Sequence, residues 1–160
     1  MTYRGMQDHA AWVLPRALEE AGRTGPDRTW LLDTDGGSLT FGEAAADMAA
    51  VAGRFAALGI APGDRVAVML PNSLDFVRVW MGLGRLGAVA VFINTELRGA
   101  FLQHQLVQSG VEMLVIHASL LPALRDLDRS LLALRRLVVV GAADGAAAAA
   151  AAGLAGLESL

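Results

Sequence analysis

Residues 66–70 read Val-Ala-Val-Met-Leu, an unbroken apolar run of the length of a β-strand. A run of this kind fits a strand that is buried on both faces, as the strands of parallel sheets are. The turn residues Ala61-Pro62-Gly63-Asp64 come before it and set where it begins. This stretch therefore predicts a central strand of a parallel sheet.

A helix is predicted immediately before that strand. Thr40 and Glu43 have the spacing of a capping box, in which each side chain binds a free backbone N–H group of the other residue. Apolar residues then recur at steps of three and four, at Phe41, Ala44, Met48, Val51, Phe55 and Leu58. Gly59 stands in the usual C-terminal position of such a helix, so the helix should end there.

A hairpin is predicted further upstream. Strands at Thr29–Leu32 and Ser38–Thr40 flank a turn at Asp35-Gly36-Gly37. Residues 1–28 carry a weak helical pattern with Trp12, Val13, Leu18 and Ala21. We expect Pro15 to break this pattern and the punctuation between Gly22 and Pro26 to close it.

Downstream of the central strand, helices and strands alternate. Asn72 is the expected cap of a helix over Ser73–Leu86, whose polar positions form only a narrow stripe, so that it should be covered on most sides. The elements expected after it are a second buried strand at 88–93, a helix at 97–109, a strand at 113–116, short helical pieces up to Ala133 and a strand at 137–140. This alternation predicts a doubly wound α/β fold with a mostly parallel sheet and right-handed crossovers.

Beyond Gly141 the composition changes to an alanine-rich and glycine-rich tail. Seven alanines occupy positions 146–152, and they offer little to bury. We expect a mobile loop or a frayed helix that ends in Leu154, Leu157 and Leu160.

Three segments are accordingly predicted. An N-terminal segment covers residues 1–28, an α/β subdomain covers 29–140, and a low-complexity tail covers 141–160.

The composition excludes several kinds of chemistry. All 13 basic residues are arginine, so this chain supplies no phosphate-loop lysine, no Schiff-base lysine and no adenylation lysine. It contains no cysteine, which excludes a disulfide framework, a thiolate nucleophile and a zinc–thiolate site. The formal net charge is -3 and the arginines are scattered, which disfavours nucleic acid as a partner.

The composition also bears on location. The longest uncharged apolar segment, around residues 86–93, is too short to span a bilayer. Arg4, Asp8 and His9 stand where a signal peptide would need apolar residues. We therefore predict a cytoplasmic protein without a transmembrane segment, and the lack of cysteine suits that reducing compartment.

Gly82, Gly84 and Gly87 match the dinucleotide fingerprint G-x-G-x-x-G by letter. That fingerprint has to follow a strand and open a helix, so that the helix N-terminus faces the pyrophosphate. Here the glycines end a helix and precede a strand. We interpret Gly82 and Gly84 as sites of close helix-to-sheet packing and Gly87 as a C-cap.

No other motif points to a catalytic or metal site. His9, His104 and His117 have no spacing that joins two of them on one helical face. We expect His104 on a solvated face and His117 at a strand end, where it hydrogen-bonds the backbone. Ser109 lacks the flanking glycine of a nucleophile elbow.

Four arginines, Arg125, Arg129, Arg135 and Arg136, are interleaved with Asp126 and Asp128. We interpret them as a solvated surface with local ion pairs rather than an anion site. We assign no catalytic, cofactor-binding or metal-ligating residue in this chain.

Several stretches, in order and spacing, resemble the N-terminal part of AMP-forming acyl-CoA synthetases of the adenylate-forming superfamily. They are Leu39-Thr40-Phe41-Gly42-Glu43, the run from Leu58 to Ser73, Gly87-Ala88-Val89 and the run from Ile93 to Arg98. The segment Asn94–Arg98 and the helix after it look most like the fatty-acid transport protein and carnitine-CoA ligase branches.

The resemblance implies an enzyme of fatty acid metabolism that activates a carboxylate with ATP and then transfers the acyl group to coenzyme A with magnesium assistance. In that family a Ser/Thr/Gly-rich loop ending in lysine, an aromatic-Gly-x-Thr-Glu segment, a ribose-binding aspartate and a lysine of the C-terminal lid carry the chemistry. None of these has a counterpart here. ATP, Mg and CoA are thus implied for the full-length family and not for this chain.

Three hypotheses follow. In the first, the chain is an incomplete N-terminal portion of an acyl-CoA ligase, truncated and inactive alone, whose partner is the remainder of the synthetase or a homologous subunit. In the second, it is a non-catalytic interaction module that pairs with a separately encoded adenylate-forming enzyme. The third, a small nucleotide-binding domain built on Gly82, Gly84 and Gly87, ranks last. The first two predict exposed apolar surface.

Overall fold

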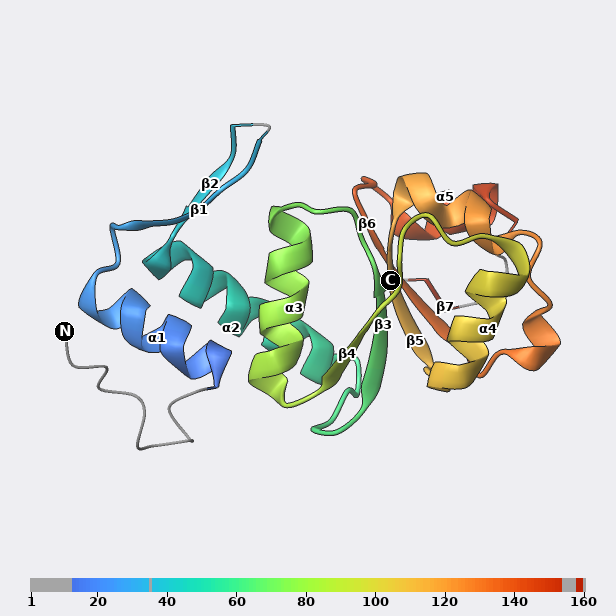
Figure 1. Cartoon of the computed structure of the whole chain (residues 1–160), viewed down its shortest axis with the longest axis horizontal. Coiled ribbons are helices and arrows are strands. Elements are labelled where there is room, and N and C mark those ends of the chain that lie inside the picture. Colours follow the sequence, from blue (N-terminus) through green and yellow to red (C-terminus); the bar gives the residue numbers. More distant parts are fainter. Residues whose placement is uncertain (1–12, 35, 154–157, 160) are drawn as a thin grey trace. The chain divides into compact units, whose positions relative to one another are not determined.

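The computed structural model describes residues 13–34, 36–153 and 158–159. The chain divides into two units, the first made of 1–62 and 77–88 and the second of 63–76 and 89–160. Among the described residues, helices and a two-stranded hairpin make up the first unit, and the second contains a parallel sheet (Figure 1). The segment boundaries predicted at residues 28 and 140 stay predictions.

The first helix, α1 (Leu14–Thr24), continues through Pro15, where the sequence pattern predicted a break. Pro15 lies in its first turn, where a missing N–H group costs nothing because that donor has no partner within the helix. The prediction that Pro15 breaks the helix was therefore wrong, since it starts the helix. Trp12 lies outside the described residues.

Strands β1 (Thr29–Leu32) and β2 (Ser38–Thr40) pair antiparallel, with the predicted bounds. The Asp33 backbone N–H donates to the Gly37 carbonyl across 2.7 Å and closes the hairpin. Asp35, in the predicted turn, lies outside the described residues.

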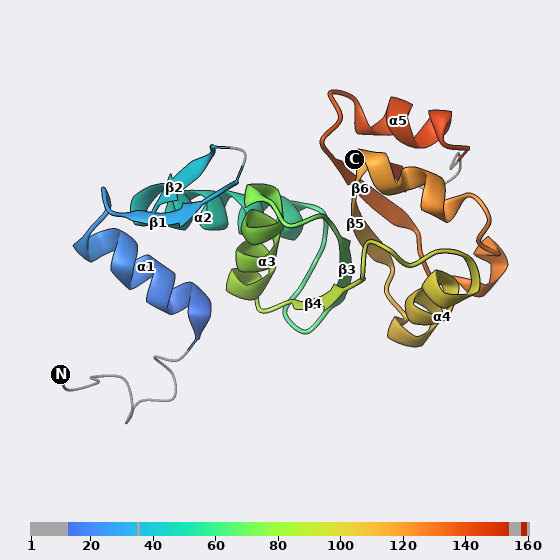
Figure 2. The ribbon, with the colours of Figure 1, turned by 45° about the horizontal axis from the view of Figure 1, so that its top comes forward.

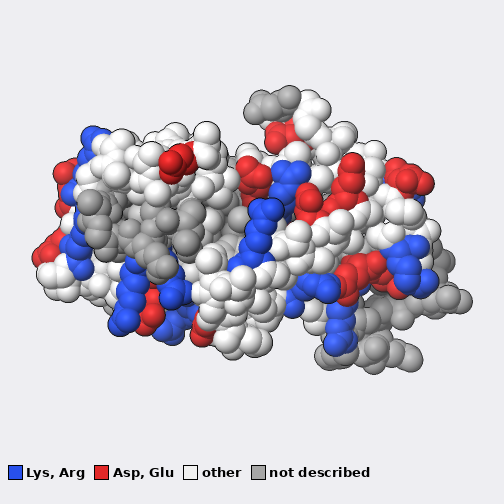
Figure 3. All heavy atoms as spheres, turned by 180° about the vertical axis from the view of Figure 1, so that it is seen from behind, with Lys and Arg blue, Asp and Glu red and all other residues white. Residues whose placement is uncertain are grey.

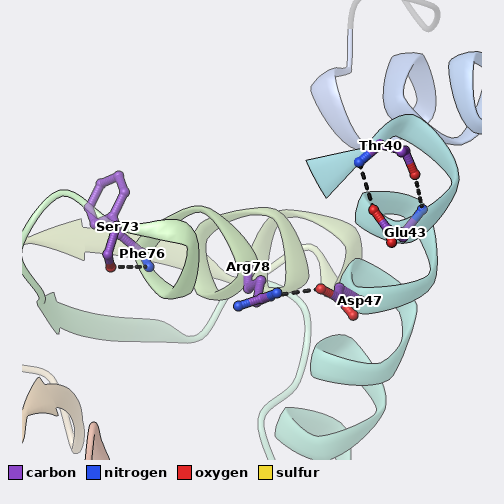
Figure 4. A network of polar contacts seen from close by, with 6 residues as sticks. All are labelled: Thr40, Glu43, Asp47, Ser73, Phe76 and Arg78. Atoms are coloured by element: carbon purple, nitrogen blue, oxygen red, sulfur yellow. Dashed lines mark hydrogen bonds and ion pairs between the residues drawn. The ribbon is translucent and has the colours of Figure 1, made fainter. Parts of the chain in front are cut away.

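Helix α2 (Phe41–Ala57) confirms both end signals. The Glu43 backbone N–H donates to Thr40 Oγ1 across 3.2 Å, and the Thr40 N–H donates to Glu43 Oε2 across 2.8 Å (Figure 4). At the other end Gly59 has a φ of 81°, and the Ile60 N–H reaches back to the Phe55 carbonyl. These are the bonds of a capping box and of a Schellman motif.

Helix α3 (Leu74–Leu86) ends in the same way, at Gly87 with a φ of 81°, which confirms the predicted C-cap. A Cβ atom added at Gly82 would lie 2.4 Å from Val51 Cγ1 of α2, and one at Gly84 would lie 3.2 Å from Pro15 Cγ of α1. The glycines therefore allow close packing between helices. The predicted helix-to-sheet role was wrong.

Two ion pairs join the same helices. Arg78 Nε of α3 lies 2.7 Å from Asp47 Oδ2 of α2 (Figure 4). Arg85 of α3 pairs with Glu19 of α1. Helix α3, from Val77 onward, is thus tied to both helices of its own unit by close packing and by charge.

The second unit contains a sheet of five strands in the order β4-β3-β5-β6-β7, and every pair is parallel. The strands are β3 (Arg65–Met69), β4 (Val89–Phe92), β5 (Met113–His117), β6 (Arg136–Val140) and β7 (Glu158–Ser159). This is one of the common doubly wound orders, with the direction of progression reversing at β3. The predicted α/β class and parallel sheet are confirmed, and β7 is an addition that the sequence pattern did not indicate.

Strand β3 pairs with β4 on one side and β5 on the other, and residues 66–69 are almost fully buried. The predicted central strand is therefore confirmed. Strand β4 lies at the end of the sheet, and Val89 and Phe92 are 49% and 46% exposed. The prediction of a second buried strand was wrong, because a short apolar run does not reveal which strand forms an edge.

One face of this sheet carries α4 (Gly99–Ser109), the 3-10 helices η2 (Ala118–Leu124) and η3 (Arg129–Leu131), and α5 (Gly145–Ala151). Apolar residues of α4, η2 and α5 share one core cluster with alternate residues of β3 and β5. In Figures 1 and 2 the red α5 lies beside the orange segment after β5. Ala149 and Ala152 are buried in the same cluster as Leu121 and Leu124 of η2.

The alanine tract is therefore a helix docked on the core, and the expectation of a mobile loop or a frayed helix was wrong. Two of its methyl groups face the core, and the sequence offered no bulky residue that would have signalled this. Leu154, Leu157 and Leu160 lie outside the described residues.

The glycine contact between α2 and α3 gives a first prediction. Gly82→Ala is expected to destabilise the chain by about 1–3 kcal/mol, because the added methyl overlaps Val51. The matched control is Gly53→Ala, on the exposed face of α2 with no atom within 4 Å of the new Cβ, which is expected to stabilise by about 0.5–1 kcal/mol. Urea unfolding followed by circular dichroism measures both. Equal effects would contradict the packing role.

Candidate functional site

Open α/β sheets bind ligands outside the carboxyl ends of their strands, at the point where the strand order reverses. In this sheet that point lies at β3, whose neighbours are β4 and β5. Met69 of β3 stands opposite Ile116 of β5, so the loops after these strands emerge side by side. The candidate site is this carboxyl edge, made of the loops 70–73, 93–98, 117–119 and 141–144.

The loop after β3 is held by Ser73. Its Oγ accepts a hydrogen bond from the Phe76 N–H across 3.2 Å (Figure 4). The same Oγ donates to the Pro71 carbonyl across 3.2 Å. Ser73 therefore caps α3. The prediction that Asn72 caps this helix was wrong by one residue, because both residue types are good caps and only the backbone path decides between them.

The loop after β4 is closed by its own side chains. Asn94 Oδ1 accepts from the Glu96 N–H across 2.9 Å. Arg98 Nη1 donates to the carbonyls of Thr95 and Leu97, across 2.5 and 2.7 Å. The guanidinium of Arg98 thus satisfies backbone acceptors of the loop that carries it.

His117 is the last residue of β5. Its Nδ1 accepts from the Ser119 N–H across 3.3 Å and lies 2.8 Å from Ser119 Oγ. In the neutral ring this leaves the proton on Nε2. The predicted strand-end histidine that hydrogen-bonds the backbone is confirmed.

The His117 ring also packs against the turn after β6. Gly141 has a φ of 81°, and a Cβ atom added there would lie 2.4 Å from His117 Nε2 and 2.8 Å from Cδ2. Only glycine fits this position, both because of the left-handed backbone and because of the ring. Sequence reasoning missed this contact, which joins residues 24 positions apart and has no local signal.

Several polar side chains of this edge form hydrogen bonds with backbone groups of the chain itself. Asp144 Oδ1 accepts from the Ala147 N–H across 2.9 Å and caps α5, as Ser73 caps α3. Arg98 is the basic residue of the four described loops, and it binds carbonyls of its own loop. These loops therefore offer little positive charge with which to balance a phosphate.

Other candidate residues lie elsewhere. His104 is exposed on α4, as predicted, and Ser109 Oγ donates to the Leu106 carbonyl of the same helix. His9 lies outside the described residues. In the part of the chain that the structure describes, no group of three or more acidic or histidine side chains could hold a metal ion.

The arginines after η2 differ from the prediction. Arg125 Nε donates to the Ala152 carbonyl across 3.1 Å, and Arg129 donates to the Gly153 carbonyl. Arg135 lies 3.9 Å from Glu112, an exposed pair that does not involve the interleaved aspartates of the predicted local ion pairs. Arg125 and Arg129 therefore hydrogen-bond the backbone at the end of α5. The interpretation of these arginines as a solvated surface missed that role.

Figure 3 shows one face of the molecule, on which blue basic groups lie among red acidic ones. No helix within the described residues is long and apolar enough to cross a membrane.

A profile of the family described as AMP-binding enzyme matches residues 18–157. The chain belongs to the AMP-binding enzyme family. The resemblance to adenylate-forming synthetases is thereby confirmed, and the match extends over both units of this AMP-binding family chain.

Two curated relatives illustrate the similarity. The long-chain fatty acid transport protein 1 of Rattus norvegicus is 34% identical over 120 residues, which is 74% of this chain and 19% of the relative. The long-chain-fatty-acid–CoA ligase FadD13 of Mycobacterium tuberculosis is 43% identical over 83 residues, which is 49% of this chain and 16% of the relative. The chain spans about a fifth of the length of these relatives.

A solved structure agrees with the fold. The Mycobacterium tuberculosis fatty acyl CoA synthetase superposes with a TM-score of 0.70 at 28% identity, over 79% of this chain and 26% of the other. The doubly wound α/β architecture of this AMP-binding family chain is therefore that of part of a larger ligase fold.

The contact of His117 with Gly141 gives a second prediction. Gly141→Ala is expected to cost more than Gly63→Ala, a control with a φ of 90° and no atom within 4 Å of the new Cβ. Both lose about 1–2 kcal/mol of stability from the left-handed backbone, and Gly141→Ala loses about 1–3 kcal/mol more from overlap with the ring.

In a His117→Ala background the extra loss at Gly141 should disappear. Chemical unfolding of the single and double variants measures this coupling. An unchanged extra loss in that background would refute the ring contact as its cause.

Proposed function

We propose that this chain is the N-terminal part of an ATP-dependent, AMP-forming acyl-CoA ligase. In the first half-reaction a carboxylate attacks the α-phosphorus of ATP, forming an acyl-adenylate and releasing pyrophosphate. In the second the thiol of CoA attacks the acyl carbon, forming a thioester and releasing AMP and a proton. The substrate class is a carboxylic acid.

The observation that carries the proposal is the match to the AMP-binding family over residues 18–157. Relatives whose names describe fatty-acid–CoA ligation or fatty acid transport support the acyl substrate. A cytoplasmic location belongs to the same proposal and is supported by the cysteine-free composition.

We further propose that these residues alone do not complete the reaction. ATP, Mg²⁺ and CoA are proposed for the complete enzyme, but the residues here do not fit them. Lysine is missing from the sequence, Arg98 binds its own loop, and the described residues hold no acidic cluster for a metal. The groups that balance phosphate charge therefore come from other residues of the enzyme, and the role of this chain is to form the sheet on which they assemble.

This gives a third prediction. The 160-residue chain should show no acid-dependent exchange of labelled pyrophosphate into ATP above a protein-free blank, with a panel of short-chain, long-chain and aromatic acids. Adding a polypeptide that carries the remaining residues of a family relative should produce exchange. The matched control is the same polypeptide without this chain.

Two results would contradict the proposal in different ways. Acid-dependent exchange by the chain alone would overturn its inactivity. If the remaining residues of each relative bind this chain but none of these pairs exchanges pyrophosphate into ATP, the ligase assignment is overturned.

An alternative is a non-catalytic module that binds a separately encoded adenylate-forming enzyme. A specific observation favours it. Helix α4 carries no formally charged residue, and Phe101 on it is 77% exposed. Exposed apolar surface marks an interaction site where it forms a contiguous patch, and Phe101 would be its centre in this alternative.

The alternative gives a fourth prediction. Phe101→Asp should reduce capture of a full-length AMP-binding family enzyme at least fivefold in a pull-down with purified proteins. His104→Asp adds the same charge at another exposed position of α4 and should leave capture unchanged. Equal capture by both variants would count against the module.

A further inference from the structure

Helix α5 is short for a stable helix. Its seven residues are one glycine and six alanines, and isolated helices below about 12–15 residues are marginal even when they are rich in alanine. Alanine has the highest helix propensity, but its single methyl group buries little area. Something other than the tract itself has to hold the helix in place.

The N-terminus of α5 is held by an ordinary cap. Asp144 Oδ1 accepts from the Ala147 N–H across 2.9 Å, and the Asp144 carbonyl accepts from the Ala148 N–H. The methyl groups of Ala149 and Ala152 pack against the core cluster of the sheet. These contacts fix one end and one face.

The carboxyl end is held by arginines. Arg125, which follows η2, donates through Nε to the Ala152 carbonyl across 3.1 Å and through Nη2 to the Ala151 carbonyl across 3.5 Å. Arg129 of η3 donates to the Gly153 carbonyl. Three consecutive carbonyls at the negative end of the helix thus face two positive side chains, which is where cations stabilise a helix.

The segment that presents Arg129 is itself anchored. Asp128 Oδ1 accepts from the Ser130 N–H across 3.0 Å and from Ser130 Oγ across 2.6 Å, and these bonds lower the pKa of the Asp128 carboxyl. The Asp128 N–H donates to Gln103 Oε1 of α4 across 3.0 Å. The connection between β5 and β6 therefore offers a fixed base for the arginine.

We propose that Arg125 and Arg129 form a clamp on the carboxyl end of α5, and that this clamp decides whether the alanine tract is helical and where the chain enters β7. Without the clamp, this seven-residue helix is held by the Asp144 cap and by the methyl groups of Ala149 and Ala152. With it, the connection between β5 and β6 is tied to the connection between β6 and β7 on one face of the sheet.

The clamp has a functional meaning that rests on the proposed function. Strand β7 is parallel to β6, so the chain leaves it at the same edge of the sheet as it leaves β3 and β5. Residues that follow a parallel strand at this edge are placed by the register of that strand. Arg125 and Arg129 would then be positioning residues for the segment that follows β7 in a complete ligase.

Hydrogen exchange of the 160-residue chain, read by mass spectrometry on peptides, tests the clamp without any activity assay. In Arg125→Ala/Arg129→Ala the peptide covering residues 145–152 should exchange roughly tenfold to a hundredfold faster, since the variant loses the three charge-assisted hydrogen bonds that two arginine side chains donate. A peptide within β5 should keep its protection. The matched control, Arg135→Ala, removes an exposed arginine whose partner is Glu112 and should leave both peptides unchanged.

Arg125→Lys/Arg129→Lys keeps the charge with fewer donors and should restore part of the protection. The clamp is overturned if the double alanine variant exchanges like the wild type in 145–152, or if β5 loses protection to the same degree, which would indicate a general loss of stability. Hydrogen exchange involves no ligand, so a negative result in this test does not contradict the ligase proposal. A negative result in the pyrophosphate assay likewise does not contradict the clamp.

Discussion

The rest of the second unit depends on the burial of β3. This strand forms backbone hydrogen bonds with two neighbours at once, and its residues 66–69 are almost inaccessible to solvent on both faces. A polar side chain anywhere in that run would be buried without a partner, at a cost of several kcal/mol. The central strand can therefore hold only apolar residues, and any chemistry at this sheet has to come from the loops beyond the strand ends.

The sequence could predict those parts of the fold that carry a local signal, and the apolar run of β3 is one of them. The hairpin, α2 and β3 each carry a local signal, a turn, a capping box or a strand-length apolar run, and the structure places them within a residue of the expected bounds. The edge position of β4 has no such signal, because Val89 and Phe92 look like core residues until the neighbouring strands are known. The docking of α5 was missed for the same reason, since alanine gives no sign of whether it faces a core.

In the candidate site, too, the sequence predicted the features that have a local signal and missed the contacts between distant residues. Composition alone showed that no lysine is present, and the place of His117 at the end of an apolar strand predicted its bond to the backbone. The contact between His117 and Gly141, and the bonds of Arg125 to the end of α5, join residues more than 20 positions apart. In the second case the acceptors are main-chain carbonyls, which every residue has, so no sequence pattern could reveal them.

The polar side chains of this chain mostly complete its own backbone hydrogen bonds. Ser73, Asp144 and Asp128 cap helices, Arg98 closes a loop, and Arg125 holds the end of α5. A side chain used in this way gives up free energy if it turns to a ligand, because it leaves a backbone group without a partner. A sheet built like this is suited to be a rigid support. In the ligase that we propose, other residues carry the catalytic groups, and those groups can change with the substrate while the support stays the same.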